Sequence, residues 1–288
     1  MAQKAFGNKS TVKKLETLAD YLNFYTTALK GKFRLNYFDA FAGTGEIPHG
    51  NSLPLFEGQV DIVSVIEGSA KRSLKIKTPF DRYYFSDSKL SNVSELESLR
   101  GEFPLLADRI FTRHGDANDE ISKYCRTEIT KNDRTVFFLD PYGNQVRWST
   151  IEEIARTEGS DLWYLFPAGL GVVRQISQDA KVQKDAETSL NLLFGDNIWF
   201  EALTEPVHQP DMLDVNMEVR RRVATADAVT RFMIKKMKTV FEGKVLDSWL
   251  PLGKSGGHWF SLIFACSNKN ARAHELAIWV ARDIMRRK

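Results

Sequence analysis

Short apolar runs recur along the chain as far as Phe166, and several of them end in an acidic residue. The runs are rich in aromatic and β-branched side chains, which is typical of strands buried on both faces of a parallel sheet. The expected strands span residues 35–41, 82–87, 109–113, 135–139 and 162–166. Helical segments lie between several of them, so the pattern predicts an α/β fold with a mostly parallel central sheet.

The region before the first expected strand predicts an amphipathic helix. Apolar side chains recur at helical spacing between residues 15 and 25, and Ser10 or Thr11 is a suitable N-cap. Gly31 closes the helix before the strand begins. We therefore assign residues 1–30 to an N-terminal helix that packs beside the sheet.

The pattern changes after the fifth strand. Residues 173–241 contain helical segments, which we interpret as a helical insertion that carries the surface for the substrate to be modified. A purely structural helical layer is equally compatible. Two later apolar segments, 245–250 and 259–265, are joined by a glycine-rich stretch. They predict an antiparallel hairpin that completes the sheet, and a helix over residues 271–285 ends the chain.

The first strand leads into a loop of small residues. Gly43 and Gly45 allow a sharp turn and the close approach of a ligand. In an open α/β sheet, ligands bind at the carboxyl ends of the strands. A strand-to-helix turn that binds nothing is the alternative. A dinucleotide fingerprint needs Gly or Ala at position 48, and Pro48 stands there, which disfavours a nicotinamide cofactor.

Acidic residues at the next two strand ends suit a nucleoside. Asp87 ends the second strand, where a carboxylate can accept hydrogen bonds from ribose hydroxyls; the alternative is an N-cap of the helix over residues 91–100. Asp116 follows the third strand and can pair with an adenine amine, while Ala117 offers a backbone N–H. A turn with an N-capping Asp is the alternative at that place.

The fourth strand ends in Asp140-Pro141-Tyr142-Gly143. A carboxylate beside a flat aromatic ring can hold a planar amine, because Asp140 and a carbonyl near Pro141 accept its hydrogens while Tyr142 stacks on the base. Such hydrogen bonds direct the nitrogen lone pair toward an electrophile and relieve the charge that develops during attack. A proline turn without chemistry is the alternative.

Composition restricts the class of protein. The chain has 288 residues, 43% of them hydrophobic and 27% charged, which is enough for a sizeable core. No apolar run approaches the roughly 20 residues of a membrane span, and the N-terminus lacks a signal peptide, so we expect a cytoplasmic protein without membrane contact. The two cysteines lie far apart, which indicates a reducing compartment, and no histidine has ligand spacing, so we predict no metal site.

The distribution of charge is more informative than its sum. The net charge of +3 is too small to imply nucleic-acid binding by itself. Basic residues nevertheless cluster at 220–222, 235–238 and 286–288, and also near the N-terminus. Such clusters can meet phosphates, which predicts a nucleic-acid partner, whereas solvated helix faces are the alternative.

Taken in order, these motifs resemble those of the S-adenosylmethionine-dependent methyltransferases. More narrowly, the chain resembles the bacterial three-Cys-motif partner protein family, a family of predicted methyltransferases. The motifs that carry the narrower resemblance are Thr11 and Lys14, Tyr21-Leu22, Phe41-Ala42-Gly43, Gly68-Ser69 and Leu139 to Gly143. The resemblance covers most of the chain and is weakest between residues 175 and 241.

The resemblance implies that residues 1–288 form a single Rossmann-like class I methyltransferase domain that binds S-adenosylmethionine. The implied cofactor-binding residues are Asp39, Phe41, Ala42, Gly43 and Gly45 for the methionine part, Asp87 for the ribose, Asp116 and Ala117 for the adenine, and Thr11 and Lys14 closing the site. The implied catalytic residues are Asp140, Pro141 and Tyr142. They take the place of the Asp-Pro-Pro-aromatic motif of methyltransferases acting on adenine in nucleic acid, but the second proline is absent.

The leading hypothesis is methyl transfer from S-adenosylmethionine to an amine on a nucleic-acid base. The alternative is a non-catalytic S-adenosylmethionine-binding subunit that serves a protein partner. A nicotinamide oxidoreductase is disfavoured by Pro48.

Overall fold

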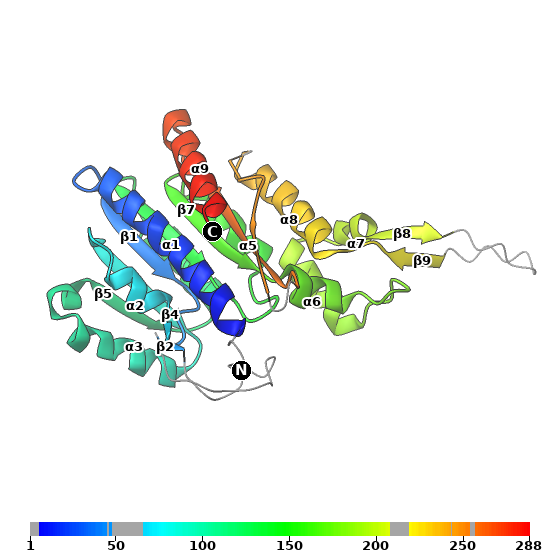
Figure 1. Cartoon of the computed structure of the whole chain (residues 1–288), viewed down its shortest axis with the longest axis horizontal. Coiled ribbons are helices and arrows are strands. Elements are labelled where there is room, and N and C mark those ends of the chain that lie inside the picture. The colour runs from blue at the N-terminus through cyan, green and yellow to red at the C-terminus, as the bar shows by residue number, and fades with distance from the viewer. Residues whose placement is uncertain (1–5, 45, 48–65, 208–218, 243, 254–256) are drawn as a thin grey trace, which may run out of the picture.

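A seven-stranded sheet organises the structure, a computed structural model that describes residues 6–44, 46–47, 66–207, 219–242, 244–253 and 257–288 (Figure 1). The strand order is β5-β4-β1-β6-β7-β11-β10. The strands span Arg34–Asp39 (β1), Arg82–Asp87 (β4), Ile110–His114 (β5), Asp133–Leu139 (β6), Ser160–Phe166 (β7), Leu250–Leu252 (β10) and Phe260–Cys266 (β11).

The chain enters this sheet in the middle and builds it outward in two directions. Strand β1 pairs in parallel with β4 and β6, and these pair in parallel with β5 and β7. Strand β11 runs antiparallel to both β7 and β10. The order therefore reverses beside β1, which creates a topological switch point. With the reversed β11 next to the edge, the arrangement is that of the Rossmann-like class I methyltransferase fold, and the predicted fold class is confirmed.

The terminal hairpin is present, but its first strand begins later than the predicted 245–250. Val245 makes a single antiparallel bridge to Ala265, whereas the regular pairing starts at Leu250. Pro251 lies in the middle of β10, opposite Ser261. A proline fits there because β10 is an edge strand and needs no N–H on its outer side.

Helices cover both faces of the sheet (Figure 1). On one face lie α1 (Phe6–Leu29), α2 (Ser69–Leu74), α3 (Leu90–Glu102) and α9 (Ala271–Arg286), and on the other α4 (Ala117–Thr127), α5 (Trp148–Arg156) and α8 (Ala226–Val240). The side chain of Tyr37 packs in the core under α1 and α9, and that of the next residue, Phe38, packs in the core under α4 and α5. Successive side chains of a strand point to opposite faces of the sheet in this way. The strands read as continuous apolar runs because both of their faces are buried.

Within the predicted range 1–30, the described helix spans Phe6–Leu29 and so starts before the predicted N-cap. Because α1 begins at Phe6, Ser10 and Thr11 lie inside it and neither is the N-cap. The Ser10 hydroxyl instead donates to the carbonyl of Gly253, 2.7 Å away. A serine favours the N-cap only when its side chain has no better partner, and here a loop distant in sequence supplies one.

Residues 173–241 hold more than helices. The region contains α6 (Lys184–Phe194), α7 (Ile198–Leu203) and α8, together with a two-stranded ribbon, β8 (Thr204–Val207) and β9 (Val219–Arg222), that the sequence pattern did not predict. Figure 1 shows the ribbon extending away from the sheet. The remaining short elements are β2 (Glu46–Ile47), β3 (Ile66–Glu67), η1 (Pro104–Arg109), η2 (Ala168–Val172) and η3 (Val173–Gln175).

The basic cluster on this ribbon is largely engaged within the chain. Arg220 pairs with Glu201, and Arg221 pairs with Glu205. The Arg222 guanidinium donates to the carbonyls of Val173 and Ile176 at 2.9 and 2.7 Å. These contacts tie the ribbon to its base and reduce the charge that it offers to phosphates.

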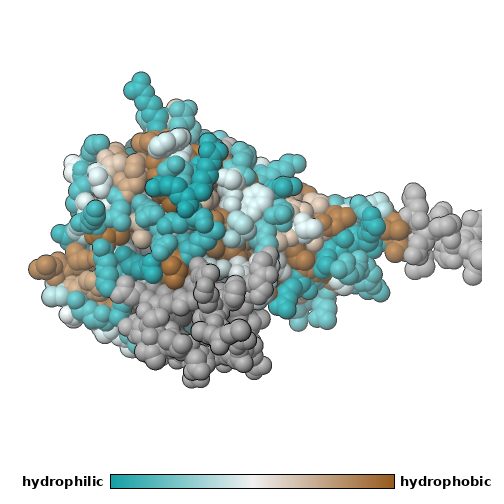
Figure 2. Space-filling model, in the orientation of Figure 1, coloured by the Kyte–Doolittle hydropathy of each residue, from teal (hydrophilic) through white to brown (hydrophobic). Residues whose placement is uncertain are grey.

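The surface is mixed in polarity. On the face shown in Figure 2, hydrophilic residues cover most of the area and apolar residues form smaller patches between them. Of the helices in the described part of the chain, none combines the length and the apolar character needed to cross a membrane.

Asp133 joins the two central strands at the end opposite to their carboxyl edge. Arg34 donates to its two oxygens at 2.6 Å each, and Asn36 and the Thr130 hydroxyl donate at 2.8 and 2.6 Å. Burial by itself would raise the pKa of Asp133, but the hydrogen bonds from Arg34, Thr130 and Asn36 outweigh burial and hold that pKa well below its usual range. The carboxylate form therefore stabilises the β1–β6 pair.

We expect Asp133→Asn to lower the free energy of unfolding at neutral pH by about 2–4 kcal/mol, because Arg34 loses a buried carboxylate partner. Since the folded-state pKa is depressed, this stability is present above the unfolded pKa of about 4 and is lost as the pH falls through the folded value. Urea unfolding at pH 7 and in steps below pH 4 measures the difference. Asp108→Asn, at an exposed position, is the control and should change nothing; equal stability of Asp133→Asn and wild type at pH 7 would contradict the assignment.

Candidate functional site

Four acidic residues gather at one edge of the sheet. Because β1, β4, β5 and β6 are parallel, their carboxyl ends share that edge. Asp39 ends β1 opposite Phe85 and Phe138 on its two neighbours, and Asp87 ends β4 opposite His114. Asp140 follows β6 directly, and Asp116 comes two residues after the end of β5. Residues far apart in sequence thus surround the switch point beside β1.

Asp87 fixes the loop that follows β1. Its Oδ2 accepts from the backbone N–H of Gly43 at 3.1 Å, and its Oδ1 accepts from that of Lys89 at 2.8 Å. Gly43 has a φ of +60°, a conformation that side chains other than glycine rarely adopt. Lys89, not Asp87, is the N-cap of α3, so the capping alternative for Asp87 is wrong. Gly45 lies outside the described residues.

Asp39 is a fully buried carboxyl with little compensation. The Tyr37 hydroxyl donates to Oδ2 at 3.3 Å, while Oδ1 has no hydrogen-bond partner among the described residues. Burial, reinforced by the nearby charge of Asp140, raises the pKa of Asp39 to about 7 despite opposing hydrogen bonds from Ser69, Phe41 and Tyr37. A cationic ligand group would remove this penalty, which makes Asp39 an acceptor for an ammonium.

Asp116 is the N-cap of α4, as the turn alternative predicted. Its Oδ1 accepts from the backbone N–H groups of Asn118 and Asp119 at 3.0 and 3.3 Å. Ala117, the first residue of the helix, is buried. Capping does not consume the carboxylate, because each oxygen carries two lone pairs and the bonds named here use Oδ1. The adenine role of Asp116 and Ala117 stays a prediction.

The loop that follows β6 begins at Asp140 with an ion pair that the sequence did not reveal. Lys14 of α1 donates to Oδ2 of Asp140, and both side chains are mostly buried. Thr11 precedes Lys14 by three residues, so the two share a face of α1. The structure thus brings together a residue predicted to close the cofactor site and a residue predicted to hold the acceptor.

Beyond Asp140, the loop presents one aromatic side chain. Pro141 is buried, whereas 65% of Tyr142 is exposed. The backbone N–H of Tyr142 donates to Oε1 of Gln145 at 2.8 Å, and Gly143 has a φ of +73°. The local turn therefore leaves a flat ring at the surface beside a carboxylate.

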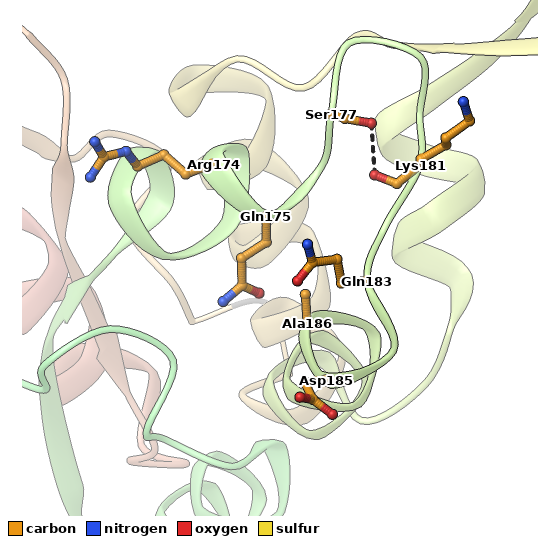
Figure 3. A pocket seen from close by; sticks show the side chains of 7 residues that line it. All are labelled: Arg174, Gln175, Ser177, Lys181, Gln183, Asp185 and Ala186. Atoms are coloured by element: carbon orange, nitrogen blue, oxygen red, sulfur yellow. Dashed lines mark hydrogen bonds between the residues drawn. The ribbon is translucent and has the colours of Figure 1, made fainter.

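A polar pocket of about 510 Å³ adjoins the far end of this loop (Figure 3). Its lining residues are Arg174, Gln175, Ser177, Lys181, Gln183, Asp185 and Ala186. Asn144 connects the loop to this wall, donating to the carbonyl of Gly171 at 2.8 Å and to Oε1 of Gln175 at 3.2 Å. Figure 3 shows the Gln175 and Gln183 amides directed into the same space while Lys181 Nζ points away. No motif in the sequence marked these residues.

A second polar network, near the hairpin, links an aspartate, a histidine and a serine in the same order as the catalytic triad of a hydrolase. His258 lies 3.1 Å from Asp227 through Nδ1 and 2.7 Å from Ser261 through Nε2. Ser261 is fully buried, and its hydroxyl also bonds the Thr230 hydroxyl at 2.6 Å. The Ser261 hydroxyl lies on a strand inside the sheet and already bonds two side chains, so we interpret this network as a tie between β11 and α8.

In the part of the chain that the structure describes, no three His, Cys, Asp or Glu side chains are grouped to hold a metal ion.

Comparisons with known proteins give distant likenesses. A scan against protein-family models finds no match, and a search of curated proteins finds none either. Among solved structures, the chain is similar to protein LPL1258 from Legionella pneumophila str. Philadelphia 1, of family DUF519, with a TM-score of 0.40 and 13% identity over 82% of this chain and 94% of that one. It is also similar to magnesium protoporphyrin IX methyltransferase (ChlM) from Synechocystis PCC 6803 with bound SAH, with a TM-score of 0.35 and 16% identity over 77% of this chain and 87% of that one.

We expect Asp39→Asn to stabilise the protein at pH 8. Since the pKa of Asp39 is raised to about 7 on folding, the folded state holds its proton more tightly and stability falls as the pH rises from about 4 to about 7. The gain from removing the charge grows over that range and levels off above it, at no more than about 4 kcal/mol. Thermal unfolding at pH 5 and pH 8 measures it, with Asp119→Asn as an exposed control. A gain of the same size at both pH values would rule out the buried charge as its cause.

Proposed function

We propose that the chain is an S-adenosylmethionine-dependent methyltransferase of the three-Cys-motif partner family and that it methylates an amine on a nucleic-acid base. The observation that carries the proposal is the convergence of Asp39, Asp87, Asp116 and Asp140 at the switch point of a class I methyltransferase sheet. Ligands of such sheets bind at that place.

The cofactor side is assigned to the first two strand ends. S-adenosylmethionine, when bound, supplies an electrophilic methyl group. The Asp39 carboxyl would receive its ammonium group, which matches the buried, unpartnered oxygen described above. Asp87 would accept the ribose hydroxyls, because the N–H groups of Gly43 and Lys89 fix the orientation of its carboxylate and leave further lone pairs. Phe41, which is half-buried, packs against the core on the face of the sheet covered by α4 and α5.

The adenine end is assigned to the start of α4. Asp116 would accept from the exocyclic amine of the ring, and the backbone N–H of Ala117 would donate to it. Asp116 is half-exposed, with 48% of its side chain open to solvent, so a ligand can reach it. Its orientation is fixed by the capping bonds to α4.

The acceptor side is assigned to the loop after β6. The ion pair with Lys14 uses Oδ2 of Asp140, and we assign Oδ1 to the hydrogen of the acceptor amine. Holding the amine in this way aims its lone pair and removes positive charge as the new N–C bond forms. Tyr142, being exposed, would stack on the base.

The pocket beside Gln175 is assigned to the part of the acceptor that flanks the methylated base. Its amides can donate and accept, which suits base edges, and Arg174 supplies a positive charge in the wall, whereas Lys181 points away and pairs with Asp179. Residues 220–222 are poorly suited to phosphates, because their guanidinium groups are already engaged. Cations of the other two clusters are paired with carboxylates too, among them Lys236, Lys238 and Lys288.

A second candidate is a non-catalytic S-adenosylmethionine-binding subunit. The ion pair between Lys14 and Asp140 favours it, because the predicted catalytic carboxylate already has a cationic partner. The absence of the second proline from the motif points the same way. The two candidates predict cofactor binding alike and differ only in methyl transfer.

We expect Asp140→Ala to reduce methyl transfer by about 100-fold or more while the affinity for S-adenosylmethionine is retained, because the carboxylate acts on the acceptor amine. Calorimetry measures cofactor binding, and incorporation of a radiolabelled methyl group into DNA, RNA and protein measures transfer. Asp108→Ala, which removes an exposed carboxylate ahead of β5, is the control. Equal activity in Asp140→Ala would defeat the catalytic assignment, and binding without any transfer by the wild type would establish the second candidate.

We expect Tyr142→Ala to raise the KM for the nucleic-acid acceptor by about 5- to 150-fold, since stacking on one base contributes about 1–3 kcal/mol. Tyr142→Phe keeps the ring and should retain a KM near that of the wild type. Both variants should bind S-adenosylmethionine normally. Steady-state kinetics with a varied acceptor measures the effect, and a loss of the same size in Tyr142→Phe would mean that the hydroxyl, not the ring, is needed.

A further inference from the structure

Asn118 is a buried amide that lies between the adenine end and the acceptor end of the candidate site. It is the second residue of α4, and only 6% of it is exposed. Its Nδ2 donates to Oδ1 of Asp116 at 3.0 Å and to the carbonyl of Gln145 at 3.0 Å. One amide nitrogen therefore contacts both the residue assigned to adenine and the loop assigned to the acceptor.

The other end of the same amide holds the acceptor loop as well. Oδ1 of Asn118 accepts from the backbone N–H of Arg147 at 2.8 Å and from the Thr150 hydroxyl at 2.8 Å. An asparagine amide has two N–H donors and two acceptor lone pairs, so these four bonds use all of its capacity. A fully satisfied buried network is rigid, and no other side chain of this length offers the same donors and acceptors.

The bonds continue from Asn118 to the exposed aromatic ring. Gln145, whose carbonyl accepts from Asn118, also accepts through Oε1 from the backbone N–H of Tyr142 at 2.8 Å. The side chain of Arg147 returns toward α4 and pairs with Asp119 at 3.3 Å. The loop over residues 142–147 is thus attached to the first turn of α4 at Gln145 and Arg147, and Tyr142 is held by Gln145.

We propose that Asn118 is a positioning residue that couples occupancy of the adenine site at Asp116 to the geometry of the acceptor loop. The inference rests on the proposed function, which assigns Asp116 to the cofactor and Tyr142 to the acceptor. A ligand that binds Asp116 restrains the carboxylate whose Oδ1 accepts one N–H of Asn118. Because the second N–H of the same planar amide donates to the carbonyl of Gln145, restraint of the amide also restrains the loop.

Hydrogen exchange with S-adenosylhomocysteine as the probe tests the coupling without knowledge of the acceptor. In the wild type, the ligand should slow exchange at residues 117–120 and also at residues 142–147. Asn118→Asp keeps the acceptor oxygen but removes both Nδ2 donations. In that variant the ligand should still slow exchange at residues 117–120, and the slowing at residues 142–147 should be lost.

Two further variants separate coupling from simple stability. Thr150→Val removes one buried hydrogen bond to Asn118 and leaves both Nδ2 donations, so it should lower the thermal midpoint yet keep the response of the loop. Gln145→Ala changes an exposed side chain, so folding is preserved. In this variant the ligand should no longer slow exchange at Tyr142 but should still slow it at Arg147. Gln145→Ala therefore supplies the test if Asn118→Asp does not fold.

The possible results separate the inference from the proposed function. The inference is overturned if the ligand still slows exchange at residues 142–147 in Asn118→Asp. It is equally overturned if the ligand still slows exchange at Tyr142 in Gln145→Ala. A response that is lost equally in Thr150→Val also overturns it, since this would mean that only the packing of α4 on α5 matters. If the wild type does not bind S-adenosylhomocysteine at all, the proposed function fails and the inference fails with it.

Discussion

Parallel pairing of β1 with strands on both sides is the constraint on which the rest of the structure depends. Its pairs with β4 and β6 require the carboxyl ends of all three strands to lie at one edge, and they make the chain reverse its direction of growth beside β1. The loops that follow these strands then meet, although they lie far apart in sequence. Asp133, with Arg34 and Asn36, fixes the opposite end of the same pair.

The buried carboxylate at that edge lowers the stability of the fold, and the packing of the sheet offsets this loss. Asp39 is held without a full set of hydrogen bonds, and its charged form is unfavourable. Aromatic pairs pack on both faces of the sheet beneath it: Phe38 stacks on Tyr84 at 5.7 Å between ring centroids on one face, and Tyr37 meets Phe85 at 6.3 Å on the other. Buried unpaired groups of this kind concentrate at functional sites, because a ligand can satisfy what the protein alone does not.

Helix α1 belongs to the site as much as the strand ends do. Its Tyr21 donates to Asp161 at 2.6 Å and meets the ring of Trp163 at 5.2 Å, which fixes the helix on the sheet. Ser10 attaches its first turns to the loop at Gly253. Lys14, between these two anchors, thereby reaches Asp140 across 126 residues of sequence. The loop after β6, to which we assign the acceptor, is therefore held by a helix that precedes every strand of the sheet in sequence.

The sequence by itself determined the five parallel strands and the acidic residues at or just after the ends of four of them. Apolar runs and the residues that stop them are local features of the chain. The sequence also offered the capping role of Asp116, which depends only on the next three residues. Only the tertiary structure decided which side chains meet: the partner of Asp140, the four bonds of Asn118 and the wall of the pocket at Gln175. Those contacts depend on how helices and loops pack against the sheet, and no spacing along the chain encodes that packing.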